Sequence, residues 1–234
     1  MGKINYIIAC WSGKRRDCIV NKHPAYYLQK HIEMLSKFKH NISQITVVIP
    51  HNPKEPLEYR NYINHIKKRS IIKVIERENF GQSYGSYSAA FHKYRDFNYY
   101  IFIEDDWVFV QDNFDKKLID FFNDANCGYL CGLTGMYRKD KVASISNGIT
   151  TSKILNLIWD KFKCIPHGNT NKNPYSVSSQ VQFSRAFTTV KKDICDITRE
   201  YAVPFNAFGK LKIFNNKKDN FLMVPTQFLQ TLGI

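Results

Sequence analysis

Short apolar runs alternate with amphipathic segments through the first half of the chain, and this alternation constrains the fold more than any other feature. Each apolar run has the length of a strand, and the segments between them carry apolar residues at helical spacing. Strands that alternate with helices indicate an α/β fold with a mainly parallel central sheet flanked by helices. The expected strands are residues 3–9, 45–49, 71–75 and 99–103, and the expected helices start at Pro24 and near Leu57 and cover residues 83–94.

The second half of the chain has a less regular pattern. It contains neither a clear linker nor an internal repeat, so we expect a single domain over residues 1–234. The expected elements are a helix starting near Asp115, short strands at 129–133 and 142–145, an amphipathic helix at 151–162, a loop at 164–174, a half-exposed strand at 175–185 and a helix at 191–201.

The composition is that of a folded protein. Of the 234 residues, 44% are hydrophobic and 15% aromatic, which excludes intrinsic disorder as the main state. No apolar run approaches the roughly 18 residues of a membrane span. The first residues lack a secretory hydrophobic segment, because Lys3, Asn5 and the polar stretch 11–16 interrupt it. We therefore expect a soluble, cytoplasmic protein without a transmembrane segment.

The formal net charge of +14 leaves two interpretations open. A strongly basic chain favours anionic partners such as nucleotides, nucleic acid or a membrane surface. The alternative is a compositional bias, since Lys, Asn, Ile, Tyr and Phe are all plentiful together. The charge alone selects no partner.

The six cysteines do not form a recognisable metal or disulfide pattern. The chain has no Cys-x-x-Cys pair and is large for a disulfide scaffold, so reduced thiols are expected. Cys127 and Cys131 flank a short apolar run and are expected in the core.

Three adjacent acids follow the expected strand at 99–103. Unpaired buried charge is costly, so Glu104, Asp105 and Asp106 are expected at the rim of the sheet rather than inside it. Hard cations such as Mg²⁺ and Mn²⁺ take oxygen ligands, often one or two carboxylates together with substrate phosphates and water. The acids therefore indicate a divalent metal site, and the alternative is an ordinary solvated acidic turn.

Polar segments follow two further strands of the predicted sheet. Trp11 and Ser12 come after the first strand, and residues 79–82 come after the third. In parallel α/β sheets, ligands bind beyond the carboxyl ends of the strands. Both segments and the acids are therefore expected at one edge.

The acidic segment resembles the Asp-x-Asp region of GT-A glycosyltransferases. The stretch from Tyr100 to Asp106, followed by Asn113-Phe114 and an apolar helix, is similar in its Glu-Asp-Asp form to the N-acetylglucosaminyltransferase-like branch. The upstream Arg77-x-Asn79-x-Gly81 is similar to the segment that approaches the nucleotide diphosphate in this superfamily. The resemblance covers residues 3–122. It implies a GT-A (Rossmann-like) fold with a nucleotide-sugar-binding half at 1–122 and an acceptor-binding half at 123–234.

The resemblance also implies roles within the acidic segment. Asp106 would bind the metal directly, Asp105 would contact the ribose, and Glu104 would support the nucleotide or the metal waters. Strand alternation alone instead puts Glu104 and Asp106 on one face, so the division of roles stays open.

Other residues are implied to bind the nucleotide sugar. Arg77 and Asn79 would orient nucleotide or phosphate oxygens, although Arg77 also suits an ion pair with Glu76 or Glu78. Gly81 and Gln82 belong to the same segment, where glycine allows close backbone approach. Trp11 and Ser12 lie where the family accommodates the base, and Trp11 is either a stacking partner or a loop anchor.

The acceptor half carries weaker signals. His167 is a candidate metal ligand, because some relatives have a late histidine there, or else an exposed loop residue. The polar and aromatic stretch at 175–185 also suits a sugar-binding surface. An inverting enzyme needs a base, usually a carboxylate. The candidate bases are Asp160, Asp193, Asp196 and Glu200, all in helix-like segments where solvent exposure is the simpler interpretation.

The expected activity is transfer of a sugar from a nucleoside diphosphate sugar to a hydroxyl of a glycan or other acceptor, assisted by Mn²⁺ or Mg²⁺. Three alternatives remain. A nucleotidyltransferase would share the sheet, but no glycine-rich Gly-x-Gly-x-Arg loop follows the first strand. A metal-dependent nuclease would need further carboxylates from other strands, and no nucleic acid partner is expected. A non-catalytic sugar-binding module would have little use for an intact Glu-Asp-Asp.

Overall fold

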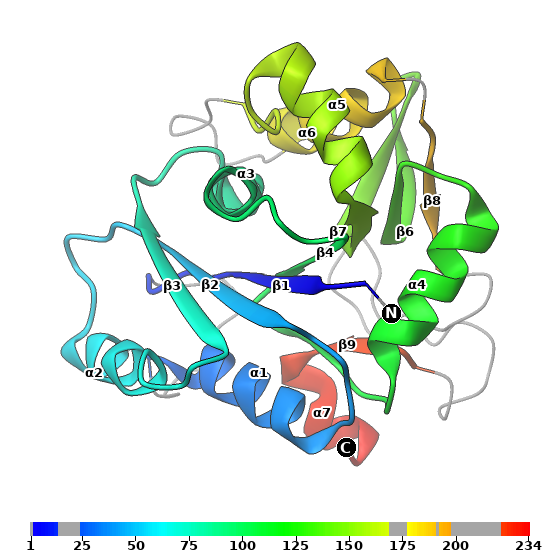
Figure 1. Cartoon of the computed structure of the whole chain (residues 1–234). Helices are drawn as coiled ribbons and strands as arrows, with labels where there is room; N and C mark the ends of the chain where they lie inside the picture. Colours follow the sequence, from blue (N-terminus) through cyan, green and yellow to red (C-terminus); the bar gives the residue numbers. More distant parts are fainter. Residues whose placement is uncertain (1, 14–23, 169–176, 191, 198–220) are drawn as a thin grey trace.

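The computed structural model describes residues 2–13, 24–168, 177–190, 192–197 and 221–234. Its centre is a seven-stranded sheet, shown in Figure 1. The first four strands of the chain are parallel, whereas β7 runs antiparallel to both β4 and β6. From edge to edge the strands are β3 (Ile72–Arg77), β2 (Gln44–Pro50), β1 (Ile4–Ala9), β4 (Tyr99–Glu104), β7 (Asp140–Thr151), β6 (Tyr129–Tyr137) and β8 (Ile194–Asp196).

Helices cover both faces of this sheet. Helices α1 and α2 lie on one face and α3, α5 and α6 on the other, and α4 packs against β6 and β7 (Figure 1). The mainly parallel sheet with flanking helices confirms the predicted α/β fold class. The helices are α1 (Tyr26–Lys37), α2 (Leu57–Ile66), α3 (Gln82–Lys93), α4 (Phe114–Ala125), α5 (Ser152–Phe162) and α6 (Val177–Thr189).

A second, two-stranded sheet joins the end of the chain to the acidic turn. Strand β5 (Trp107–Phe109) pairs antiparallel with β9 (Met223–Pro225), which leads through a short 3₁₀ helix (Thr226–Phe228) into α7 (Leu229–Leu232). Val108, Val224 and Leu229 form a small apolar cluster with Met34 of α1. The C-terminal segment is thereby held next to the residues that follow β4.

The main core explains why the strands form where the apolar runs predict them. All six residues of β1 and the four central residues of β4 are buried. Phe102 of β4 stacks on Tyr87 of α3 with ring centroids 4.4 Å apart, and the ring of Phe183 from α6 contacts both. A single cluster of buried side chains therefore includes residues from both halves of the chain.

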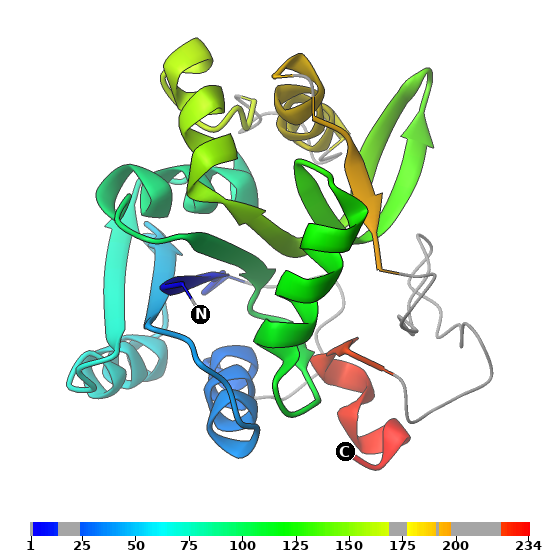
Figure 2. The ribbon, with the colours of Figure 1, turned by 45° about the vertical axis from the view of Figure 1, so that its right-hand side comes forward.

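The structure corrects two expectations for the second half and confirms two short strands as parts of longer ones. Residues 177–185 of the stretch predicted as a strand lie in helix α6, which continues to Thr189, because Phe183 and Phe187 lie one helical turn apart and both contact Tyr129. The helix expected at 191–201 contains strand β8, which pairs with β6 in parallel. The two short strands are the arms of a long hairpin, β6–β7, which extends away from the rest of the sheet in Figure 2.

The structure confirms several other predictions, on the second half of the chain and on the cysteines. The amphipathic helix at 151–162 is confirmed as α5, and residues 164–168 form a loop as predicted. Cys127 and Cys131 are buried, as predicted. No helix within the described ranges is both long and apolar enough to cross a membrane. Arg15, Arg16, Cys18, Tyr175 and Glu200 lie outside the described residues.

Candidate active site

The three acids occupy the turn between β4 and β5, at the carboxyl edge of the parallel strands. Glu104 is the last residue of β4, and Asp105 and Asp106 form the turn into β5. Glu104 and Asp106 are half-buried, whereas Asp105 between them is only 2% exposed. Asp105 is therefore the most buried of the three acids, and the division of roles between Glu104 and Asp106 stays a prediction.

Asp105 ties the acidic turn to the loop after β1. Its Oδ2 accepts a hydrogen bond from the backbone N–H of Trp11 at 3.2 Å. Its own backbone N–H donates to the carbonyl of Ala9 at 3.1 Å, which continues the β1–β4 ladder by one residue. A buried carboxylate requires such donors, because an uncompensated one would be strongly destabilising. Asp105 thus fixes the backbone on which Trp11 is carried.

A buried histidine contacts the same turn, and no motif or periodicity in the sequence indicates it. His31 of α1 lies with Nδ1 3.4 Å from the carbonyl of Asp105 and Nε2 2.8 Å from the hydroxyl of Tyr6. Because a carbonyl only accepts, Nδ1 carries the proton and Nε2 accepts from the tyrosine hydroxyl. Complete burial lowers the pKa of His31 to about 3, so the ring is neutral at physiological pH.

Glu104 connects the acidic turn to α3 and to β7. Its Oε1 accepts a hydrogen bond from the hydroxyl of Ser83 at 2.5 Å, and its backbone N–H donates to Oδ1 of Asn147 at 2.9 Å. Ser83 lies in the first turn of α3, where the helix dipole favours negative charge. Glu104 is therefore stabilised as a carboxylate at the start of this helix.

Asp106 lies at the rim of the site, beside the C-terminal segment. Its carbonyl accepts a hydrogen bond from the backbone N–H of Thr226 at 2.7 Å, and Thr226 is buried. This bond connects the backbone of Asp106 to the C-terminal segment. The side chain is half-buried, and its Oδ1 atom is buried.

The loop between β3 and α3 is organised by Arg77. Nη1 donates to the carbonyls of Glu78 and Phe80, both at 2.6 Å, and Nη2 donates to the carbonyl of Gln82 at 2.5 Å. Nε and Nη2 also donate to Oγ of Ser86 at 3.1 and 2.9 Å. Burial lowers the pKa of Arg77 to about 10, so the guanidinium stays charged at neutral pH. The guanidinium group thereby stabilises one conformation of the loop.

This arrangement bears on the two interpretations of Arg77. The neighbouring Glu76 forms its ion pairs with Arg60 and Lys67 rather than with Arg77. Glu78 meets Arg77 through its backbone carbonyl. Arg77 therefore acts on the loop itself, and any ligand contact would be made by the loop that it shapes.

The start of α3 is built from close backbone contacts. Gly81 has a φ of +65°, and a Cβ there would lie 2.2 Å from Nδ1 of His167. A Cβ on Gly85 would lie 2.0 Å from the carbonyl oxygen of Phe80. Gln82 also has a positive φ of 53° and is exposed, and Asn79 is half-buried. Only glycine fits the first two positions without displacing the loop.

Trp11 and Ser12 lie in the loop that follows β1, as predicted. Oγ of the buried Ser12 accepts a hydrogen bond at 3.1 Å from Nδ2 of Asn52, which follows β2. The Trp11 ring packs against Gly13 and remains 36% exposed. The ring is both anchored in its loop and open on part of its surface, so the two interpretations made from the sequence are compatible.

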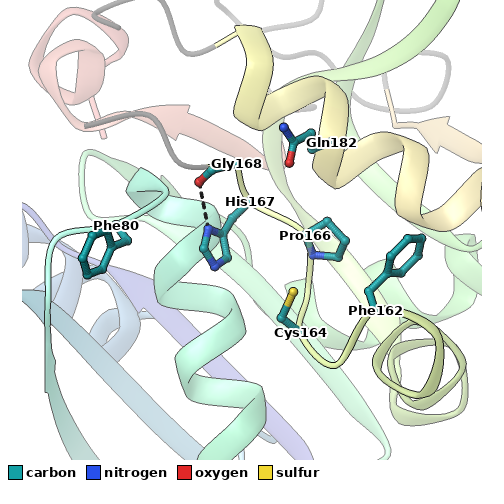
Figure 3. Close-up of a pocket in the computed structure, with 7 residues that line it drawn as sticks. All are labelled: Phe80, Phe162, Cys164, Pro166, His167, Gly168 and Gln182. Carbon is teal, nitrogen blue, oxygen red and sulfur yellow. Dashed lines mark hydrogen bonds between the residues drawn. The ribbon is translucent and has the colours of Figure 1, made fainter. Parts of the chain in front are cut away.

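His167 approaches the same end of α3 from the loop after α5. Its Nδ1 lies 3.0 Å from the carbonyl of Gly168, and its ring lies against Gly81 (Figure 3). This places His167 beside the first turn of the helix whose Ser83 contacts Glu104. The loop histidine is thus half-buried against the start of α3, rather than freely solvated.

Three of the four carboxylates considered as bases are described, and they lie on α5 or beside and within β8. Asp160 is exposed on α5, and Asp193 pairs with Lys141 at 3.5 Å. Asp196 is in β8 and accepts hydrogen bonds from the backbone N–H and the hydroxyl of Thr134. These partners give Asp193 and Asp196 structural roles at the far edge of the sheet, and neither is on a helix.

The donor set at the edge suits a hard divalent cation bound jointly with a phosphate. Among the residues that the structure describes, no three His, Cys, Asp or Glu side chains form a group able to hold a metal ion alone. Mg²⁺ and Mn²⁺ sites that include substrate phosphates need only one or two carboxylates. The half-buried carboxylates of Glu104 and Asp106 fit that chemistry.

Comparisons with known proteins identify the fold. No protein-family model matches the chain, and no curated protein does either. Among solved structures, the S. aureus TarS 1–349 complex with UDP has a TM-score of 0.54 at 11% identity. The mannosyltransferase PcManGT from Pyrobaculum calidifontis, in complex with GDP-Man and Mn²⁺, has a TM-score of 0.56 at 7% identity. Both matches cover 83% of this chain, which spans only 57% and 54% of theirs.

A nucleotidyltransferase-type enzyme has the same fold. The 4-diphosphocytidyl-2C-methyl-D-erythritol synthase from Anaerococcus prevotii has a TM-score of 0.52 at 13% identity, and the match covers 83% of this chain and 86% of that one. At these identities the likeness establishes the fold alone. The chain has the GT-A-like fold shared by nucleotide-sugar transferases and nucleotidyltransferases.

Proposed function

We propose that this chain is a metal-dependent glycosyltransferase, which moves a sugar from a nucleoside diphosphate sugar to a hydroxyl of a glycan or other acceptor. The observation that carries the proposal is the placement of the acidic turn. Its carboxylates lie at the carboxyl edge of the sheet and contact both the loop after β1 and the first turn of α3. Ligands of α/β sheets bind at that edge.

The proposed roles follow from these contacts. Asp106, supported by Glu104, holds Mn²⁺ or Mg²⁺, which when bound neutralises charge on the diphosphate leaving group. Asp105 lies at the ribose side and fixes the backbone of Trp11, whose exposed ring stacks on the base. Backbone groups near Gly81 and Gln82 present the N-terminus of α3 to the diphosphate, where a helix dipole favours anions.

Two assignments extend this proposal to residues around the loop. Asn79 reaches nucleotide or phosphate oxygens, and Arg77 orients the loop by holding its carbonyls. His167, which adjoins Gly81, is a further candidate ligand for the metal. Residues 1–122 bind the nucleotide sugar and residues 123–234 bind the acceptor, within one domain in the cytoplasm.

A nucleotidyltransferase is the second candidate function. It is favoured by the match to the synthase from A. prevotii, which is covered over 86% of its length, whereas TarS and the mannosyltransferase are covered over little more than half. Its reaction joins a sugar or polyol phosphate to a nucleoside triphosphate and releases pyrophosphate. The two functions therefore differ in their products.

Product analysis tests the proposal. The protein is incubated with Mn²⁺ and a panel of nucleoside diphosphate sugars, and separately with nucleoside triphosphates plus sugar 1-phosphates. Release of a nucleoside diphosphate in the first reaction supports glycosyl transfer or its hydrolytic side reaction. Release of pyrophosphate in the second establishes the nucleotidyltransferase. Nucleotide binding without turnover favours a binding module, and cleavage of added nucleic acid favours a nuclease.

Variants assign the acids within the turn. Asp106→Ala is expected to abolish metal-supported nucleotide binding, while Asp124→Ala, at an exposed aspartate on α4, should leave it unchanged. If Asp106→Ala binds normally and Glu104→Ala does not, Glu104 is the metal ligand instead.

A further inference from the structure

A hollow beside His167 has the features of a ligand site. It has a volume of about 480 Å³ and lies between the start of α3, the loop after α5 and α6 (Figure 3). A second hollow of about 490 Å³ shares Phe80 and His167 with it. Small-molecule sites typically have volumes of about 300–1,000 Å³ and combine apolar walls with a few polar groups. The first hollow is lined by Phe80, Phe162, Cys164, Pro166, His167, Gly168 and Gln182.

The wall of this hollow is fixed before any ligand binds. The backbone N–H of the buried Ile165 donates to Oγ of Ser88 on α3 at 3.1 Å. A Cβ on Gly168 would lie 3.4 Å from the side chains of both Gln182 and Ser179, so the loop rests directly on α6. The loop from Cys164 to Gly168 is therefore held from two helices, and little ordering entropy would be lost on binding.

Two aromatic side chains flank the hollow and remain open to solvent. Phe80 is 45% exposed and Phe162 is 37% exposed, and both are visible on opposite sides of His167 in Figure 3. Both side chains line the hollow, so their exposed ring surface is accessible to a ligand there. The amide of Gln182 adds both a donor and an acceptor. Apolar rings with an amide match a pyranose, which has apolar C–H faces and hydroxyls around its edge.

The hollow and the acidic turn are both connected to the start of α3. His167 forms its wall and rests on Gly81, and two residues later the hydroxyl of Ser83 donates to Glu104. A ligand in the hollow would therefore lie beside the helix end that faces the acids.

We propose that this hollow binds a saccharide acceptor whose sugar units contact Phe80 and Phe162, on either side of His167, with Gln182 bonded to its hydroxyls. This inference rests on the proposed glycosyltransferase function and specifies its acceptor as a carbohydrate. It places acceptor recognition on the loop after α5, on α6 and on Phe80 of the loop before α3, with His167 in the wall of the hollow between the two aromatic rings.

Saturation-transfer NMR with simple glycosides tests the site. The probes are the methyl glycosides of glucose, galactose, mannose and N-acetylglucosamine at millimolar concentrations, and the dissociation constant of any binder is measured by titration. Phe80→Ala and Phe162→Ala should each weaken binding about three- to tenfold, from the loss of one stacked ring. Gln182→Ala should weaken it by a similar factor. Tyr137→Ala removes an equally exposed aromatic ring at the hairpin tip and should have no effect.

The possible outcomes separate this inference from the proposed function. Binding of a glycoside that is lost in the hollow variants and kept in Tyr137→Ala supports the site. Absence of binding by every probe, or binding that none of the three hollow variants weakens, overturns it. Binding of UDP and GDP with Mn²⁺ is measured in the same samples. If the sugar binds in the hollow but no nucleotide binds, the glycosyltransferase fails while the sugar site stands, and the reverse result leaves the transferase standing without this site.

Discussion

Replacing Arg77 by lysine separates a loop clamp from a direct phosphate ligand. The guanidinium makes five hydrogen bonds, to three backbone carbonyls and to Oγ of Ser86. Lysine keeps the positive charge but has three donors, so at least two of these bonds are lost. At about 1.5 kcal/mol for each hydrogen bond to a charged group, we expect a loss of about 3 kcal/mol in the free energy of unfolding.

Urea denaturation followed by circular dichroism measures this change, with Arg69→Lys as the control. Arg69 is exposed at the end of α2, and its replacement should change the free energy of unfolding by less than about 0.5 kcal/mol. If Arg77 is a loop clamp, Arg77→Lys lowers the free energy of unfolding even in the absence of nucleotide. If Arg77→Lys is as stable as the parent protein and only nucleotide affinity falls, the clamp reasoning is refuted and Arg77 contacts the ligand directly.

Three further predictions concern other contacts around the site. Gly85→Ala should lower the free energy of unfolding by about 1–3 kcal/mol, because the added Cβ would lie 2.0 Å from the carbonyl oxygen of Phe80. This overpacking outweighs the gain of about 1 kcal/mol in helix propensity. Thermal unfolding measures the net change, and a stabilised variant would contradict the prediction. The pKa of His31 falls from 6.5 to about 3 on folding, so the free energy of unfolding should decrease as pH falls below 6.5, by at most about 1.4 kcal/mol per pH unit. Denaturation at pH 7, 6 and 5 should show a smaller decrease in His31→Gln than in the parent protein. An equal decrease in both proteins would exclude the histidine as the cause. His167→Ala should weaken Mn²⁺-supported UDP binding at least about tenfold if His167 is a ligand, and calorimetric titration showing an unchanged affinity would remove it from the metal site.

The first half of the fold was predictable because its signals are local. The apolar runs of β1 and β4 are long enough to identify strands, and the acids that end β4 break the pattern at one point in the sequence. The convergence of Trp11, the loop before α3 and the acids also followed from a general rule on parallel sheets. These inferences needed no knowledge of which residues are neighbours in space.

The partners of the acids were not predictable for the opposite reason. His31, Ser83 and Asn147 contact the turn from three different elements, and no periodicity distinguishes them from their neighbours. Helix α6 was misassigned because its serines, glutamines and aromatics fit a strand period almost as well as a helical one. Strand β8 depends on pairing with β6, which is a tertiary contact that overrides local propensity.

The central claim is that the acidic turn binds a nucleoside diphosphate through a divalent cation. Calorimetric titration of UDP and GDP, with Mn²⁺ and with EDTA, tests it most directly in the parent protein, Asp106→Asn and the control Asp124→Asn. We predict Mn²⁺-dependent binding of at least one nucleotide to the parent and to Asp124→Asn, and its loss in Asp106→Asn. Equal affinities in all three proteins, or binding that is unaffected by EDTA, would contradict the account.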